Sequence, residues 1–399
     1  MVSYPLAADR PPVPGEPGEA VRLRQAMAQT VIDGGCAPSE PVRDALRTVP
    51  RHRFAPEVNL AAAYDGGDRA LITRRDETGT AISSVSAAWL QADMLESLRL
   101  RPGAIMFEAA SGGYNAAAGP DGRVVSVDID PWVVRRTRAF LTEARSGRVT
   151  AVEADAPLGA PAHLVPRGGF DGSMITYNCW DISPAWREQL AEGGLLVMSL
   201  EMGGYTRAIA FERRGEVLHA RRFTYCGFVR DQGHQARPAP VVPLLDGALA
   251  LRFDDGSAAD TEGLEGALRG RRHEVVTGVT MGANSYFGSL QLYAATTLSG
   301  FYRLAAHLEP AEEVTGIAND RDAPAIIGEA SLAYLIHVPT KDGDSPQGKE
   351  WVRAFGEQGP ELAERLVATV RAWDRHIRAD DSRSAGRMPR SHSSRWSWS

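Results

Sequence analysis

Residues 105–115 read Ile-Met-Phe-Glu-Ala-Ala-Ser-Gly-Gly-Tyr-Asn, a short apolar run that ends at Glu108 and passes into a glycine turn. A second apolar run, residues 124–128, ends at Asp128. In a doubly wound sheet both acids lie at the carboxyl edge of parallel strands, where ligands bind. Glycine lets the backbone approach a ligand closely, and an acid that ends the second strand accepts both ribose hydroxyls.

The segments around this stretch alternate between strand and helix patterns. Strands are predicted over 103–107, 124–128, 149–153, 170–177 and 195–200, and helices over 20–32, 39–48, 87–98, 131–143 and 184–190. Strands that alternate with helices form right-handed crossovers and a parallel sheet that is covered on both faces. The sequence therefore predicts an α/β fold with a doubly wound, Rossmann-like sheet.

The character of the sequence changes after Gly203-Gly204, which predicts a domain boundary there. Short β-like runs follow over 208–213, 218–225, 248–253 and 274–279, and helices are expected near Ala305 and over 360–377. We therefore expect a flexible arm over 1–19, a first domain over 20–204, a second α+β domain over 205–378, and a disordered Arg/Ser-rich tail over 379–399.

Composition excludes several classes of protein. A net charge of -6 provides no field that gathers nucleic acid by counterion release or binds an anionic membrane surface. No apolar run approaches the ~20 residues that span a bilayer, and the first twenty residues hold no apolar leader. Three scattered cysteines and the spacing of the histidines predict neither a disulfide scaffold nor a metal site. These features predict a cytoplasmic protein.

The glycine turn restricts the kind of ligand. The pattern Gly-x-Gly-x-x-Gly, which places a pyrophosphate on a helix N-terminus, is absent, and this disfavours a dehydrogenase. The stretch Ala110-Ser-Gly-Gly113 suits a nucleoside that carries no phosphate, as in S-adenosylmethionine. Taken alone, the turn is equally consistent with an ordinary connection between strand and helix in any α/β protein.

Several separate motifs recur in a specific order over roughly residues 20–200. They are Val49-Pro-Arg-His-Arg-Phe-Ala-Pro56, Ala63-Tyr-Asp65, Gly79-Thr-Ala-Ile-Ser83, Leu98-Arg-Leu-Arg-Pro-Gly103, the Glu108 turn, Val152-Glu-Ala-Asp155 and Gly193-Gly-Leu-Leu-Val197. In these motifs the chain resembles the protein-L-isoaspartate O-methyltransferase family. It is most similar to the long actinobacterial branch encoded beside ribosomally made, modified peptides (lanthipeptides, lasso peptides, graspetides). This finer likeness rests on Ser111-Gly-Gly-Tyr-Asn115, Trp180-Asp-Ile-Ser-Pro-Ala-Trp186, Cys226-Gly-Phe228 and the extra C-terminal domain.

The resemblance implies an S-adenosylmethionine-dependent methyltransferase and assigns roles by position. Asp128 would hold the ribose hydroxyls, Ile129 would lie against the adenine, and Asp155 would lie at the adenine edge with Ala156. Ser83 matches the family's serine beside the substrate carboxylate. The residues that the resemblance implies for cofactor binding are Glu108, Ala110, Ser111, Gly112, Gly113, Asp128, Ile129, Asp155 and Ala156.

Three features depart from the family pattern. Ala110 stands where the turn usually has its first glycine, and Val85 stands where many relatives carry proline. Gly112 and Asp128 lie only 16 positions apart, where about 20 or more are expected, so the first crossover helix is cut down. These departures keep open an alternative in which the chain is a degenerate paralogue that binds peptide without catalysis.

The carboxylate that receives the methyl group is already ionised at pH 7, so we expect hydrogen-bond donors rather than a His-centred triad. Ser83 is the predicted catalytic donor, with Ser84 and Ser86 as further substrate-binding residues. Its alternative role is to cap the helix that follows. Trp180 is predicted to form a wall of the site, with core packing as the alternative. Asp181 is predicted to position a substrate amide, with a solvent-exposed loop acid as the alternative.

The resemblance implies that the substrate is an aspartate side chain in a precursor peptide. The ester then closes to an aspartimide, which hydrolyses to isoaspartate, and ring closure need not be enzyme-catalysed. One alternative is a general repair enzyme for isoaspartate in damaged proteins, which the large accessory domain disfavours. The second domain would extend a groove for the peptide, and we expect neither a nucleic acid nor a membrane as a partner.

Overall fold

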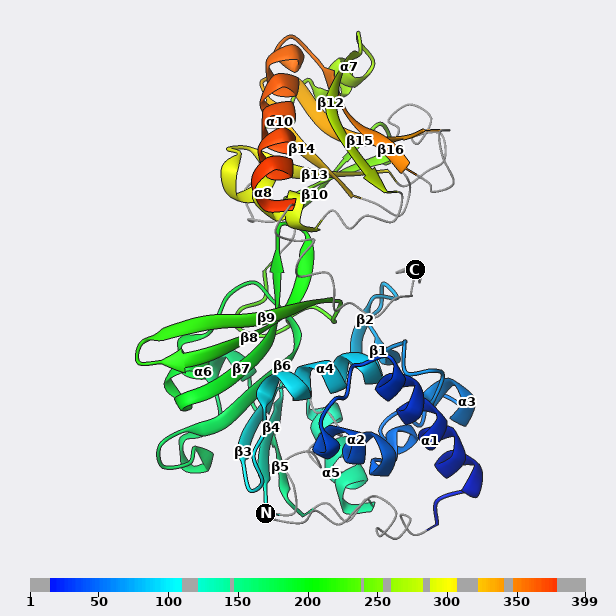
Figure 1. Ribbon diagram of the computed structural model, residues 1–399, viewed down its shortest axis with the longest axis vertical. Helices are drawn as coiled ribbons and strands as arrows, with labels where there is room; N and C mark the ends of the chain where they lie inside the picture. The colour runs from blue at the N-terminus through cyan, green and yellow to red at the C-terminus, as the bar shows by residue number, and fades with distance from the viewer. Residues whose placement is uncertain are drawn as a thin grey trace. The chain divides into compact units, whose positions relative to one another are not determined.

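The computed structural model describes residues 15–109, 121–143, 147–237, 240–253, 260–282, 288–306, 322–340 and 347–378. The chain divides into two compact units. The first comprises Met1–Glu201 and Thr206–Ala236, and the second comprises Met202–Tyr205 and Arg237–Ser399. Strands and helices of both units are labelled in Figure 1.

The first unit begins with a group of helices. These are α1 (Gly18–Asp33), α2 (Glu40–Thr48), the 3-10 turn Arg51–Arg53, α3 (Leu60–Ala63) and α4 (Ala88–Leu98). Of these helices, α1, α2 and α3 are drawn in blue and α4 in cyan in Figure 1. The apolar residues of α1 recur at helical spacing, so that Met27 and Val31 are buried on one face. They share a core with Leu90 and Met94 of α4, and this core packs against the sheet.

The sheet of the first unit contains seven strands in the order β5-β4-β3-β6-β7-β8-β9. Their bounds are β3 (Ile105–Ala109), β4 (Arg123–Asp128), β5 (Val149–Glu153), β6 (Phe170–Cys179), β7 (Leu190–Met202), β8 (Tyr205–Arg214) and β9 (Val217–Cys226). The pairs β3–β4, β4–β5, β3–β6 and β6–β7 are parallel. The winding direction therefore reverses between β3 and β6, where ligands bind in such sheets. This confirms the predicted doubly wound α/β class.

Two helices connect strands of this sheet, α5 (Pro131–Glu143) and α6 (Pro184–Glu188). The start of α5 is set locally, because the Asp130 carboxylate accepts the Trp132 N–H at 2.8 Å and proline occupies the first helical position. Ser183 caps α6 in the same way, accepting the Ala185 N–H at 3.2 Å. Both helices thus begin directly after strand ends, beside the carboxyl edge of the sheet.

A separate antiparallel hairpin, β1 (Leu71–Arg75) and β2 (Ala81–Val85), precedes α4. The Asp76 carboxylate stabilises its turn by accepting the backbone N–H groups of Thr78 and Thr80, both at 2.9 Å. The sequence prediction did not include this hairpin. It carries the predicted catalytic serine, so its position decides the geometry of the site.

The second unit is a seven-stranded sheet in the order β10-β11-β13-β14-β15-β16-β12, in which the residue register is antiparallel throughout. Its strands are β10 (Val241–Leu244), β11 (Leu249–Arg252), β12 (His273–Gly282), β13 (Phe301–Ala306), β14 (Asp322–Gly328), β15 (Ser331–Thr340) and β16 (Gln347–Phe355). Its helices are α7 (Leu264–Leu268), α8 (Gly288–Thr297) and α10 (Gly359–Trp373), followed by the π-helical turn Asp374–Arg378.

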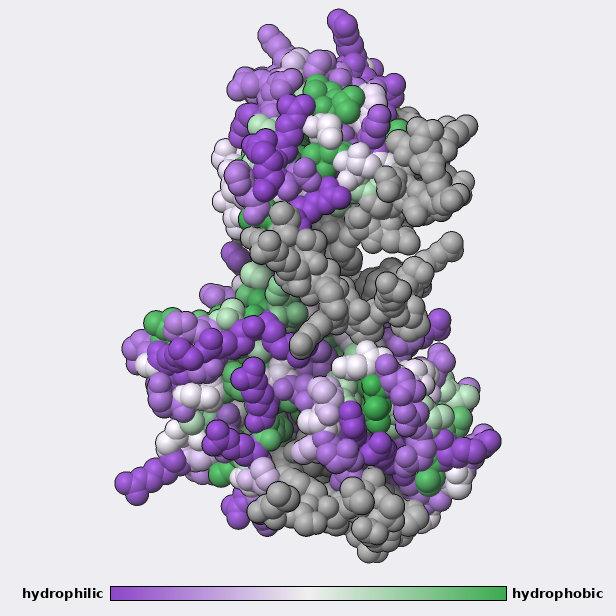
Figure 2. Space-filling model, viewed as in Figure 1, coloured by the Kyte–Doolittle hydropathy of each residue, from purple (hydrophilic) through white to green (hydrophobic). Residues whose placement is uncertain are grey.

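Alternation along β15 divides the core of this unit between the two faces of its sheet. Tyr334 and Ile336 pack with α7, whereas Leu335 packs with Leu366 of α10 and its neighbours. Hydrophilic residues cover the outer side of α10 in Figure 2, as expected for a helix that buries one face. The predicted helix over 360–377 is confirmed.

Two sequence expectations need correction. The boundary expected near residue 204 falls instead after Ala236, because β8 and β9 extend the first sheet and the buried Ala208 and Ala210 join the core of the first unit. The helix expected near Ala305 is wrong, because that residue lies in β13.

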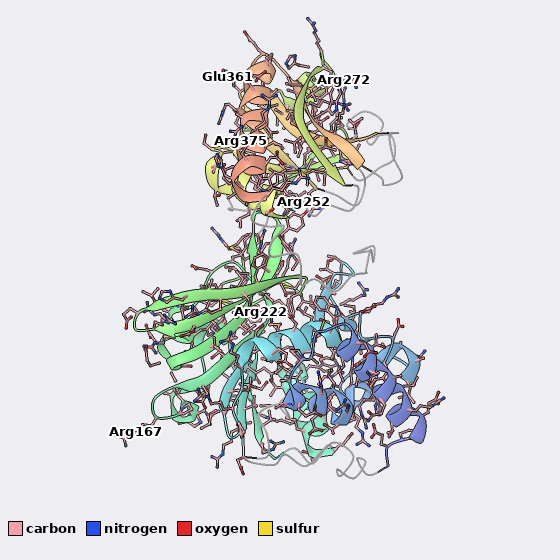
Figure 3. All side chains as sticks on the ribbon, in the orientation of Figure 1. Arg167, Arg222, Arg252, Arg272, Glu361 and Arg375 are labelled. Atoms are coloured by element: carbon pink, nitrogen blue, oxygen red, sulfur yellow. The ribbon has the colours of Figure 1, made fainter. Side chains whose placement is uncertain are left out.

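Arg222, labelled in Figure 3, projects from β9 and forms an ion pair with Asp93 of α4. This ion pair links β9 to α4 within the first unit.

Candidate active site

A cavity of about 920 Å³, its open mouth included, lies within the first unit at the carboxyl ends of β4, β5 and β6. Side chains from the strand ends, from α5, from the β1–β2 hairpin and from the segment after β9 line it. Of the predicted site residues, the cavity brings together Ser83, Ser84, Asp128, Ile129, Asp155 and Ala156.

Asp128 ends β4, and its carboxylate is partly buried at the cavity wall. Burial raises the pKa of this carboxyl to about 6, although its Oδ1 accepts the backbone N–H of Asp130 at 2.9 Å. The next residue, Ile129, is a large apolar side chain that is 43% exposed. An acceptor carboxylate beside an exposed apolar surface matches a ribose joined to an adenine, so the residues present fit the adenosyl group of S-adenosylmethionine.

The end of β5 supplies a second wall. The carbonyl of the buried Ala156 accepts the indole N–H of Trp186 at 2.7 Å, which fixes the turn that follows this strand. The Asp155 carboxylate accepts the backbone N–H of His234 at 2.7 Å, so a distant segment packs directly on this residue. Trp186 is 1% exposed and lies behind the wall as a core residue.

Ser83 enters the cavity from β2. In the hairpin register it lies opposite Arg74, and its Oγ accepts a hydrogen bond from Thr73 Oγ1 at 2.9 Å. The helix that follows begins at Ala88 with Ala87 in the cap position, so Ser83 does not cap it. The structure thus removes the alternative role of this serine and leaves its hydroxyl in the cavity.

Charged side chains connect the β1–β2 hairpin to the start of α5, beside Asp128. Arg74 forms an ion pair with Asp130, and its guanidinium lies over the ring of Trp132 at 5.5 Å. Arg136 of α5 lies over the same ring at 4.3 Å and pairs with Glu57 at 2.6 Å. The hairpin that carries Ser83 and the strand end that carries Asp128 are therefore held together.

The segment after β9 contributes residues that sequence reasoning missed. Val229, Arg230, Asp231 and Gln232 line the cavity. Their backbone pairs with Asn178 at the end of β6, because Asn178 N–H donates to Val229 O at 2.7 Å. The sequence signal that could have identified these residues is the polar run Arg230-Asp-Gln232, which follows a predicted strand. The predicted strand over 218–225 falls in the predicted second domain, so the segment that follows it was expected there too.

Other predicted residues do not line the cavity. Glu108 is 3% exposed inside the sheet, and Ser86 is 8% exposed beneath the start of α4. Asp181 is an exposed acid whose carboxylate accepts the N–H of Ile182 at 2.7 Å, and Trp180 is half-buried beside it. Both precede the cap of α6 at Ser183, and neither is among the lining residues. Ala110, Ser111, Gly112 and Gly113 lie outside the described residues, as does the shortened crossover.

Two further findings concern ligand classes. Within the described ranges, no group of three or more His, Cys, Asp or Glu side chains is arranged to hold a metal ion. Over the same residues, no helix combines the length and the apolar character that crossing a membrane requires.

A doubly wound sheet with an acid at the end of β4 and an exposed apolar residue beside it is typical of S-adenosylmethionine-dependent methyltransferases. Residues 22–235 match the family described as protein-L-isoaspartate(D-aspartate) O-methyltransferase (PCMT). The chain belongs to this family, whose members are S-adenosylmethionine-dependent protein carboxyl O-methyltransferases. The predicted resemblance to this family, the cofactor and the enzyme class are thereby confirmed, whereas the likeness to the branch encoded beside modified peptides stays a prediction.

Curated relatives carry the same description. The protein-L-isoaspartate O-methyltransferase of Methanococcoides burtonii is 31% identical over 185 residues, which cover 45% of this chain and 85% of the relative. That of Pyrobaculum neutrophilum is 30% identical over 220 residues, covering 52% and 98%. A solved structure from Plasmodium falciparum, described as a putative protein-L-isoaspartate O-methyltransferase in complex with S-adenosyl-L-homocysteine, is 14% identical. It covers 52% of this chain and 98% of its own, with a TM-score of 0.44.

Proposed function

We propose that this enzyme esterifies an aspartate side chain of a ribosomally made precursor peptide, in a route to aspartimide and isoaspartate. The observation that carries the proposal is that Ser83 and Ser84 line the same cavity as Asp128. Hydroxyl donors suited to a carboxylate and an acceptor suited to a ribose thus line one cavity. This arrangement supports methyl transfer to a carboxylate.

S-adenosylmethionine, when bound, supplies a methyl group on a positively charged sulfur. The protein then has to orient a carboxylate and keep water away, because solvation of the two opposite charges opposes their approach. Ser83 is suited to the first task. Its oxygen accepts from Thr73, which leaves the Ser83 hydrogen to donate to a carboxylate oxygen. Ile82, Val85 and Val229 give the cavity the apolar wall that the second task needs.

The presence of the second unit favours a dedicated peptide substrate over a general one. The family match ends at residue 235, and the second unit resumes at Arg237. A repair enzyme must accept many sequences around the damaged residue, so an added recognition unit offers it little. We therefore assign residues 237–378 the recognition of the precursor peptide outside the methylated residue.

Repair of isoaspartate is the second candidate, because the curated relatives are named protein-L-isoaspartate O-methyltransferases. The two functions separate in one experiment, in which the full chain and S-adenosylmethionine are offered an isoaspartyl peptide or a precursor peptide encoded beside the enzyme. Mass spectrometry should show the methyl ester, and then loss of methanol, with the precursor. Methylation of the isoaspartyl peptide alone would establish repair instead.

The non-catalytic alternative has its own test. Calorimetry with S-adenosylhomocysteine reports on the cofactor site without any peptide. Binding is expected, with Asp128→Asn as the weakened comparison. Absence of binding by the unmodified chain would favour a paralogue that binds peptide without methyl transfer.

A further inference from the structure

Two buried polar atoms in the cavity have no oxygen or nitrogen partner among the described residues, although the Cys179 thiol lies beside the first of them. They are the hydroxyl oxygen of Tyr177 and the Oδ2 oxygen of Asp231, and both residues line the cavity. Buried polar groups in proteins are almost always paired, since an unpaired one costs free energy. Because both atoms lie in a cavity, a ligand is the partner that we assign to them.

Both side chains are fixed by their surroundings. Tyr177 is 9% exposed near the end of β6, and its ring lies edge-on to that of Trp186, 6.5 Å between centroids. Asp231 donates its N–H to Asn178 O at 3.2 Å, and its Oδ1 accepts the Gly233 N–H at 2.8 Å. One carboxylate oxygen is thereby committed to the backbone, and the other is left for a ligand.

The next residue places this pair beside the substrate hairpin. The Gln232 side-chain amide donates to the carbonyl of Ile82 at 2.9 Å, directly before Ser83. Asp231 therefore lies between the end of β6 and the serine that we assign to the substrate carboxylate. A hydrogen-bond acceptor and a hydrogen-bond donor are present close to the group that becomes the methyl ester.

An esterified aspartate in a peptide presents two groups that match this pair. Its carbonyl oxygen accepts a hydrogen bond, and the backbone N–H of the next residue donates one. The same two groups react with each other when the five-membered imide closes. An acceptor for the N–H and a donor for the carbonyl oxygen are the polar groups that this reaction requires.

We propose that Asp231 and Tyr177 catalyse this ring closure, so that the enzyme forms the aspartimide as well as the ester. The backbone nitrogen bonds to the ester carbon while its proton passes to the Asp231 carboxylate. The Tyr177 hydroxyl donates to the carbonyl oxygen as negative charge develops there. The C–OCH3 bond then breaks, and methoxide takes the proton from Asp231 and leaves as methanol. The carboxylate is regenerated, and no further reactant is needed.

The electrostatics of both groups agree with these roles. Burial and the neighbouring Asp155 carboxylate raise the pKa of Asp231, which makes it a stronger base than an ordinary carboxylate. Burial raises the pKa of Tyr177 far above its usual range, so this hydroxyl stays protonated and remains a donor. This inference rests on the proposed function, because it takes a peptide methyl ester as its substrate.

The test starts from a ready-made ester. The full chain with S-adenosylhomocysteine is mixed with a synthetic Asp-Gly peptide carrying a β-methyl ester, and separately with an isoaspartyl-Gly peptide carrying an α-methyl ester. Chromatography with mass spectrometry follows imide and methanol loss against a protein-free sample at the same pH. We expect acceleration with at least one ester. Asp231→Asn should reduce that acceleration about 100-fold and Tyr177→Phe about 10-fold, whereas Asp231→Glu should restore part of it.

Asp33→Asn, which changes an exposed acid at the end of α1, is the matched control and should leave the acceleration intact. Acceleration by neither ester at millimolar peptide, or equal rates for the unmodified chain and Asp231→Asn, would overturn the inference. So would weaker binding of S-adenosylhomocysteine to Asp231→Asn without loss of ring closure, which would assign Asp231 to the cofactor. This assay starts from a synthetic ester and needs no methyl transfer. A failure of the proposed methylation would therefore show in the methylation assay and not in this one.

Discussion

The affinity for S-adenosylhomocysteine should fall as the pH drops below 6, because Asp128 must be ionised to accept two ribose hydroxyls. Burial raises the pKa of this carboxyl to about 6 in the ligand-free protein. Protonation turns one acceptor oxygen into a donor, so the ligand selects the ionised form. The observed Kd then rises by the reciprocal of the ionised fraction.

The magnitude follows from that pKa. At a pKa of about 6, about 97% of Asp128 is ionised at pH 7.5 and about 9% at pH 5, so Kd should rise about 11-fold over this interval. Isothermal calorimetry at constant ionic strength measures it directly. Asp128→Asn should bind about 100-fold more weakly at pH 7.5, through the loss of charge-assisted hydrogen bonds, and its Kd should no longer depend on pH.

Asp128→Asn should weaken ligand binding but stabilise the ligand-free protein. A carboxyl whose pKa is raised by folding disfavours the folded state once it ionises, so stability is lost as the pH rises through about 6. Asp128→Asn removes that loss and should raise the melting temperature above pH 6.

Asp231→Asn is the control, because it removes a different acid from the same cavity. Its Kd for S-adenosylhomocysteine should depend on pH as that of the unmodified chain does. A Kd that stays constant from pH 7.5 to 5, or an Asp128→Asn variant that keeps the profile, would show that Asp128 does not hold the ribose.

Three further outcomes are expected. Ser83→Ala should lower kcat at least about 10-fold in a methyl-transfer assay while calorimetry shows unchanged S-adenosylhomocysteine affinity, because only a donor to the substrate carboxylate is lost. Arg51→Met should lower the free energy of unfolding by about 3 kcal/mol in urea titrations, because the buried guanidinium donates to Ala63 O, Gln91 Oε1 and two further carbonyls. Trp373→Ala should cost about 3–5 kcal/mol, measured by thermal unfolding, because it empties a buried position on α10.

Each of these outcomes can fail in a recognisable way. Unchanged kcat in Ser83→Ala would move the donor role to Ser84. Unchanged stability in Arg51→Met would mean that water replaces the guanidinium at its carbonyl partners. Trp373→Ala should alter the transition of the second unit, and a change confined to the first unit would contradict the packing of α10.

Local sequence signals predicted α5 and β5 beside the cofactor cavity, but not the β1–β2 hairpin. The helix predicted over 131–143 and the strand predicted over 149–153 have the observed bounds. Their limits are set by neighbouring residues, such as the cap at Asp130 and the proline that follows it. Asp128 was placed at the site because parallel strands end at one edge of the sheet, whereas Asp155 was placed there by the family resemblance.

The assignment of β8 and β9 required the tertiary structure. Their alternating pattern is typical of antiparallel strands in any domain, and only packing of Ala208 and Ala210 into the first core assigns them to that sheet. The segment with Asp231 follows β9, so its position depended on the same assignment. Its contacts with Asn178 and Ile82 span more than fifty residues, beyond the range of any local pattern.

The amino-acid sequence by itself determined the family, the cofactor class and the strand ends that carry acids, because motif order and local periodicity are properties of neighbouring residues. The tertiary structure alone decided which side chains share a cavity. It brought the Ser83 hairpin and the segment around Asp231 to the cavity, and it left Asp181 out of the cavity lining. Those placements depend on which apolar faces bury one another, and this is settled by contacts between residues far apart in the chain.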